Sequence, residues 1–261
     1  MLVKRACHYR LINLFKMKDS NVTNKRNRYV ITAMVSVLLF VIQRFFSNVA
    51  GYLSNIFDHS AFDKDDLFIS ISVHHILQML FAIALIILLD RVMKIDGFKL
   101  RPRYDEKGIR YTLIFCAVLA VYYLIVYFIG SYTKTINTYD YDLDLVNVTG
   151  TLGFQLFLSG PSEEILFRSL PIATLLYCMR PDGKKDRITA VVIAALLFGI
   201  AHIDFSNFSI PWFQVCYAFV LGLAYGFVFI RTKSVIYPMI MHSVSNVISV
   251  GGCYLYMMFF R

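Results

Sequence analysis

Seven predominantly apolar stretches restrict the fold of this chain more than any other feature of its sequence. Most are about 20 residues long, the length at which an α-helix crosses the ~30 Å hydrocarbon core of a bilayer. Lipid offers no partners for backbone N–H and C=O groups, so each such stretch must satisfy them internally, as a helix does. We therefore expect an all-α, polytopic transmembrane helical bundle of about seven spans, with an eighth, re-entrant or surface helix left open. The expected spans are Tyr29–Phe46, Leu67–Leu89, Tyr111–Gly130, Val148–Cys178, Ile188–Ile203, Pro211–Ile230 and Val235–Phe260.

The charge distribution supports this topology. Only 16% of the residues are charged and 58% are hydrophobic, whereas soluble proteins carry about 25% charged residues. The net charge of +9 would suggest a nucleic-acid partner for a soluble protein, but most of the 26 Lys and Arg residues precede the first span or lie in every second loop. That pattern marks cytosolic loops. We expect no nucleic-acid partner, a basic cytosolic tail over residues 1–28, a bundle over residues 29–261, and an external C-terminus.

The fourth span contains charged residues that need an explanation. Its centre reads LSGPSEEILFRSL from Leu158 to Leu170, with Gly160-Pro161 predicting a break or kink. A charge near the middle of a bilayer costs at least ~2.5 kcal/mol. Glu164 and Arg168 are four residues apart on one helical face and can pair, whereas Glu163 points about 140° away from Arg168. We interpret Glu163 as a general base facing a cavity; the alternative is that all three side chains form a purely structural buried network.

Two further spans carry polar residues with helical spacing. His202 ends the fifth span, one turn after Phe198, and His242 lies four residues before Asn246 in the seventh. A single histidine in a membrane helix is more often a hydrogen-bonded structural residue than a functional one, and His74 and His75 in the second span are interpreted as interhelical hydrogen-bonding residues. Two carboxylates, two histidines and an asparagine on three spans together indicate one polar site.

These residues form three motifs in a fixed order. EEILFR fits the pattern EExxxR, FGIAH fits FxxxH, and HSVSN fits HxxxN. In this combination the chain resembles the CPBP family of intramembrane proteases, which includes the type II CAAX prenyl endopeptidases and bacteriocin-processing proteins. The resemblance covers the half from Val148 to Arg261 and implies that this is the catalytic half.

The resemblance implies hydrolysis of a peptide bond within the membrane. By motif position, Glu163 would activate water, His202 would help to bind or polarise it, and His242 and Asn246 would stabilise the oxyanion. Glu164 and Arg168 would be the supporting pair, and Phe198 would pack beside the site. The expected substrate is a peptide or lipidated protein, surrounded by membrane lipid, and the expected location is a bacterial cell membrane with the N-terminus cytosolic.

A metal ion and two other functions stay open at this point. Glu163, His202 and His242 could hold a divalent metal such as zinc, although the same residues could activate water without one; no other cofactor site is expected. The main alternative function is a non-catalytic membrane scaffold or immunity protein that binds a sensor kinase or a bacteriocin. A transporter with a proton-carrying glutamate is disfavoured, because no paired broken helix or inverted repeat is visible.

Overall fold

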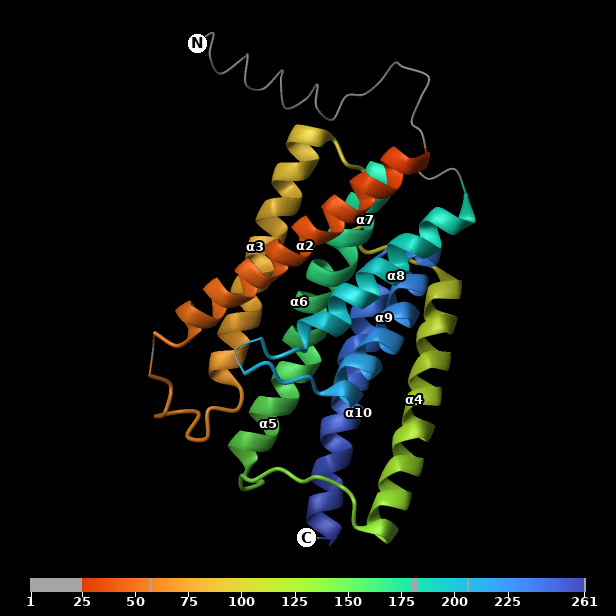
Figure 1. Cartoon of the computed structure of the whole chain (residues 1–261). Coiled ribbons are helices and arrows are strands. Elements are labelled where there is room, and N and C mark those ends of the chain that lie inside the picture. Colours follow the sequence, from red (N-terminus) through yellow and green to blue (C-terminus); the bar gives the residue numbers. More distant parts are fainter. Residues whose placement is uncertain (1–24, 57, 180–182, 206, 261) are drawn as a thin grey trace.

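The described part of the chain, residues 25–56, 58–179, 183–205 and 207–260 of a computed structural model, is helical throughout its length apart from connecting loops (Figure 1). Its one β-type pairing there is an isolated bridge between Asp204 and Ser209. This confirms the predicted all-α bundle. Most of the predicted basic tail, residues 1–24, lies outside the described residues, and Lys25–Arg28 belong to the first described helix.

The helices follow the predicted spans closely. Among the residues that the structure describes, five helices are long and apolar enough to cross a membrane: α2 (Lys25–Ser54), α3 (Ile69–Met93), α4 (Glu106–Thr133), α9 (Trp212–Thr232) and α10 (Ile236–Phe260). The predicted fourth span is one continuous helical run, divided into α5 (Leu145–Phe154), a π-helical segment (Gln155–Ser159), α6 (Gly160–Glu164), a second π-helical segment (Ile165–Ser169) and α7 (Leu170–Met179). The remaining helix is α8 (Lys184–Ala201).

The long helical run occupies the centre of the bundle. Figure 1 shows α6 and α7 with α2 and α3 on one side and with α8, α9, α10 and α4 on the other, and the packing of α2 on α7, α3 on α6 and α10 on α6 agrees with this view. Many side chains of this run are completely buried: Glu164, Arg168, Leu166, Leu170, Ile172 and Leu175. The charged motif of the fourth span therefore lies in the protein interior and not against lipid.

The outer helices instead expose apolar side chains. Phe45 on α2 and Leu113, Val118, Leu124 and Phe128 on α4 are all more than half exposed. Soluble monomers rarely show apolar patches of this extent, whereas lipid tails cover such a surface without cost. The composition, the five long apolar helices and this apolar exterior make the protein an integral membrane protein.

Of the break or kink predicted at Gly160-Pro161, the break is absent, because the helical run is continuous and contains a widened turn there. Proline lacks the N–H of a regular helix and its ring crowds the preceding turn. The π-helical segment Gln155–Ser159 immediately before it relaxes that turn, as single π-type turns commonly do near functional sites. Gly160 meanwhile lets α6 approach α10 closely, since a Cβ there would lie 2.6 Å from the Met239 carbonyl oxygen. The helix thus continues and is held tightly against α10.

Candidate active site

A buried ion pair supports the site from below. Arg168 Nη1 lies 3.0 Å from Glu164 Oε1, and both side chains are completely buried. The guanidinium carbon lies 4.1 Å from the centre of the Phe198 ring and 5.0 Å from that of Tyr225, so cation–π contacts add to the pair. The four-residue spacing predicted this pair, and the structure contains it. Phe198, predicted to pack beside the site, lies directly on Arg168.

Glu164 also orients His242. The Nδ1–H of His242 donates to Glu164 Oε1 at 2.8 Å, and its ring stacks on Tyr225 with the ring centres 5.2 Å apart. The Tyr225 hydroxyl is in turn hydrogen-bonded to Ser245 (2.9 Å). With Nδ1 committed to the carboxylate, the other ring nitrogen faces the site: His242 Nε2 lies 3.6 Å from Glu163 Oε2.

His75 of α3 approaches Glu163 from the opposite direction. Its Nδ1 lies 2.7 Å from Ser162 Oγ, and that hydroxyl donates to the Ser159 carbonyl. Since the one hydroxyl proton is used there, the hydrogen bond must run from His75 Nδ1–H to Ser162. His75 Nε2 is then left facing Glu163 Oε1 at 3.8 Å. The interhelical hydrogen bond predicted for this histidine is present, but its place beside Glu163 had no signal in the sequence.

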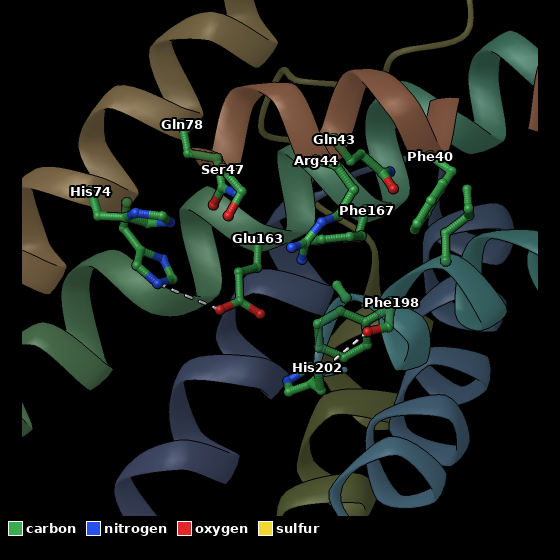
Figure 2. Close-up of a pocket in the computed structure, with 13 residues that line it drawn as sticks. Phe40, Gln43, Arg44, Ser47, His74, Gln78, Glu163, Phe167, Phe198 and His202 are labelled. Carbon is green, nitrogen blue, oxygen red and sulfur yellow. Dashed lines mark hydrogen bonds and ion pairs between the residues drawn. The ribbon is translucent and has the colours of Figure 1, made fainter. Parts of the chain in front are cut away.

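Glu163 therefore sits between two imidazoles. Its side chain is 18% exposed, and Figure 2 shows it pointing into a cavity toward His202. Both neutral imidazoles would present a lone pair to the carboxylate, because each Nδ1 carries its proton. Such a contact is repulsive. It becomes favourable when one of the groups gains a proton, or when a water molecule lies between them and donates hydrogen bonds. The arrangement is suited to receiving a proton and returning it.

The two other predicted residues lie on the same cavity wall. His202 caps the C-terminus of α8, and its Nδ1–H donates to the Phe198 carbonyl at 2.9 Å, which leaves Nε2 for the cavity. Asn246 lies one turn after His242, and its amide donates to Ser159 Oγ at 2.8 Å. α8 begins with charged residues (Lys184 onward) and crosses the bundle obliquely in Figure 1, so its far end meets the early turns of α10.

These side chains line a cavity large enough for a peptide segment. Its volume is about 670 Å³. Its lining combines the polar side chains described above with aromatic side chains from α4, α9 and the loop before α5. The lining residues include His75, Glu163, His202, His242, Asn246, Tyr123, Tyr139, Phe213 and Tyr217.

The side chains do not fit the metal site considered from the sequence. Within the ranges that the structure describes, no group of three or more His, Cys, Asp or Glu side chains is arranged to hold a metal ion. Glu163 Oε2 and His242 Nε2, 3.6 Å apart, are spaced as two ligands of one ion can be, but a catalytic zinc ion needs a third protein donor that converges on the same point. We derive no step through a metal.

Comparison with known proteins was consistent with the three motifs. The family model for the type II CAAX prenyl endopeptidases, described as Rce1-like, matches residues 146–248, a segment that contains every predicted site residue. Comparisons with curated proteins and with solved structures gave no match. His75, which completes the surroundings of Glu163, lies outside the matched segment. Residues 146–248 are thus similar to the type II CAAX prenyl endopeptidase family, and this match confirms the predicted relationship for that part of the chain.

Proposed function

We propose that this protein hydrolyses a peptide bond by using Glu163 to activate a water molecule. The observation that carries the proposal is the position of Glu163: a carboxylate inside a membrane bundle, at a cavity wall, with Nε2 of His75 and of His242 within 3.6–3.8 Å. A merely structural carboxylate would be neutralised by a direct partner, as Glu164 is by Arg168.

The proposed reaction needs only side chains of this cavity. Water held between Glu163 and the free Nε2 of His202 gives a proton to Glu163 while its oxygen bonds to the scissile carbonyl carbon. The resulting oxyanion accepts hydrogen bonds from the second N–H of the Asn246 amide and from His242 when its Nε2 is protonated. The C–N bond then breaks, and Glu163 passes its proton to the leaving amine.

Glu164 and Arg168 act indirectly in this scheme, through His242. Their pair holds His242 in the tautomer with the proton on Nδ1, so Nε2 always faces the reacting groups. Orientation of this kind places catalytic atoms at reacting distance before the substrate arrives.

The family match supports our proposal for the substrate class. The family is named for endopeptidases of prenylated CAAX proteins, and we propose a prenylated carboxyl-terminal peptide as the substrate of this chain. The prenyl chain would remain in the surrounding lipid. We further propose a bacterial cell membrane with the N-terminus cytosolic, because the basic segments precede α2 and lie between α3 and α4.

The test is cleavage of a fluorescence-quenched prenylated peptide by the protein purified into lipid nanodiscs. Glu163→Gln and His202→Ala should each lower kcat by about 10²–10⁴-fold, the contribution of a general base. Glu106→Gln, which changes an exposed glutamate at the start of α4, is the matched control and should leave kcat unchanged. A parent protein that binds the peptide without cleaving it would support the scaffold function instead.

A further inference from the structure

A second cavity, lined in part by other residues than the peptide-sized one, also reaches Glu163. It lies between α2, α3, the central run and α8, and its volume is about 120 Å³. Figure 2 shows Gln43, Arg44 and Ser47 of α2 and His74 and Gln78 of α3 around one side of it. Glu163, His75, Phe198 and His202 line both cavities.

We infer that this second cavity, here called the α2–α3 cavity, is a water reservoir that supplies the hydrolytic water to Glu163 while the peptide occupies the larger cavity. The inference rests on the proposed function and adds a role for two helices that lie outside the family match.

The α2–α3 cavity is lined by polar side chains of the kinds that form hydrogen bonds with water. Polar residues inside a transmembrane bundle are costly and usually face one another or a water-filled space. Here α2 and α3, otherwise apolar helices, turn an amide, a hydroxyl, an imidazole and a guanidinium toward the same small space. A volume of this size has room for several water molecules and offers each of them two or more polar partners.

One buried acceptor, the side-chain oxygen of Gln43, lacks a hydrogen-bond donor in the described ranges of the chain. Gln43 is only 4% exposed, and its Nε2 donates to the Leu166 carbonyl at 3.2 Å. Its Oε1 is buried and has no hydrogen-bond partner among the described residues. A buried acceptor left without a donor costs about 1–3 kcal/mol. A small shift of the amide toward the adjoining cavity, which Gln43 lines, would bring a water molecule within hydrogen-bonding distance of Oε1 and remove that cost.

The volumes of the two cavities indicate which one holds the peptide and which one holds water. The α2–α3 cavity is less than a fifth of the volume of the peptide-sized cavity and is too small for a peptide. When a peptide fills the larger cavity it displaces water from that side of Glu163. The carboxylate keeps contact with water only through the α2–α3 cavity. His75, at the junction, has its Nε2 directed at Glu163 and can accept a proton from that carboxylate.

The kinetic test fills the α2–α3 cavity. Ser47→Leu places an apolar side chain in it, and Ser36→Leu makes the same change elsewhere on α2, at a serine that does not line the cavity. Ser47→Leu should lower kcat at least tenfold and leave KM within twofold, while Ser36→Leu should match the parent in both. An unchanged kcat in Ser47→Leu overturns the inference. So does a raised KM with unchanged kcat, because the cavity would then hold part of the peptide.

A second measurement does not depend on activity or on a folded Ser47→Leu variant. Hydroxyl radicals made by X-ray radiolysis oxidise side chains that touch ordered water. Phe167, which lines the α2–α3 cavity, and Phe229, which lines neither cavity, are similarly buried at 5% and 3% exposed. Phe167 should oxidise at least threefold faster than Phe229 in the parent protein. Equal rates mean a dry cavity and refute the inference. Fast oxidation of Phe167 in a parent protein that cleaves no peptide refutes the proposed function alone.

Discussion

Gly160→Ala tests whether the spacing of α6 and α10 sets the activity. Gly160 faces α10 so closely that an added Cβ would lie 2.6 Å from the Met239 carbonyl oxygen and 2.9 Å from the Ser243 backbone nitrogen. Both are backbone atoms, so no side-chain rotation relieves the contact. Ordinary van der Waals contact begins at 3.4 Å, and the two backbones must therefore separate by about 0.8 Å.

That separation of the two backbones would move Glu163 away from His242. Glu163 follows Gly160 by three residues on α6, and His242 follows Met239 by three residues on α10, so their 3.6 Å distance widens with the helices. A misplacement of about 1 Å costs on the order of 10²-fold in rate, and overpacking costs about 1–3 kcal/mol in stability. We expect kcat to fall about 100-fold and the unfolding temperature to fall with it.

The matched control lies on the same helical run. A Cβ at Gly153 meets no atom within 4 Å, and alanine is favoured over glycine inside a helix by up to about 1 kcal/mol. Gly153→Ala should keep the parent kcat and unfold at the same or a slightly higher temperature. Peptide cleavage and thermal unfolding are measured on all three proteins in nanodiscs. If folded Gly160→Ala cleaves within threefold of Gly153→Ala, the helix spacing does not control the site.

Three other changes probe the surroundings of Glu163. Arg168→Met leaves the charge of Glu164 buried without its cation, so the free energy of unfolding in denaturant should drop by about 3–5 kcal/mol; a drop below about 1 kcal/mol would show that the pair is not a major support. Tyr225→Phe keeps the ring on His242 but removes the hydroxyl bonded to Ser245, so stability should fall by about 1 kcal/mol with kcat within threefold, whereas a hundredfold loss would place the hydroxyl in the chemistry. Treatment with a chelator such as phenanthroline should leave kcat unchanged, because the described side chains offer no three-ligand set; loss that zinc restores would contradict this reading of the site.

Most of the fold could be predicted from hydropathy. All seven helical rods in the described part of the chain coincide with predicted apolar stretches, because in lipid the helix is the conformation that satisfies every backbone group. The ends were less accurate. The first span was expected over Tyr29–Phe46, whereas α2 covers Lys25–Ser54. A helix can continue past the apolar core into the interface, where water also satisfies its backbone, so hydropathy does not determine where it stops.

The sequence predicted a break or kink at Gly160-Pro161, and the chain does not break there for a local reason. The presence of a proline in the sequence indicates that a regular α-helix cannot continue undisturbed. It does not indicate whether the helix breaks there or its turn widens. Packing against α10, which Gly160 permits, favours the widened turn.

The site could be predicted only where charge interrupts an apolar pattern. Glu163, Glu164 and Arg168 are conspicuous because ionised groups are costly in lipid, and the four-residue spacing predicted the pair of Glu164 with Arg168. The role of His75 could not be inferred, because its approach to Glu163 depends on the packing of α3 against α6. Ser162 and Tyr225, which orient the two imidazoles, are of residue types that attract no notice in a sequence.

The most direct test of the central claim follows the oxygen atom of the attacking water. A single turnover is run in ¹⁸O-labelled water with enzyme in excess over peptide, and the new carboxyl terminus is analysed by mass spectrometry. If Glu163 activates water for direct attack, one ¹⁸O atom appears in all the product of this first turnover. Unlabelled product would contradict the account, because the oxygen would then have come from the enzyme, with Glu163 acting as a nucleophile rather than as a base.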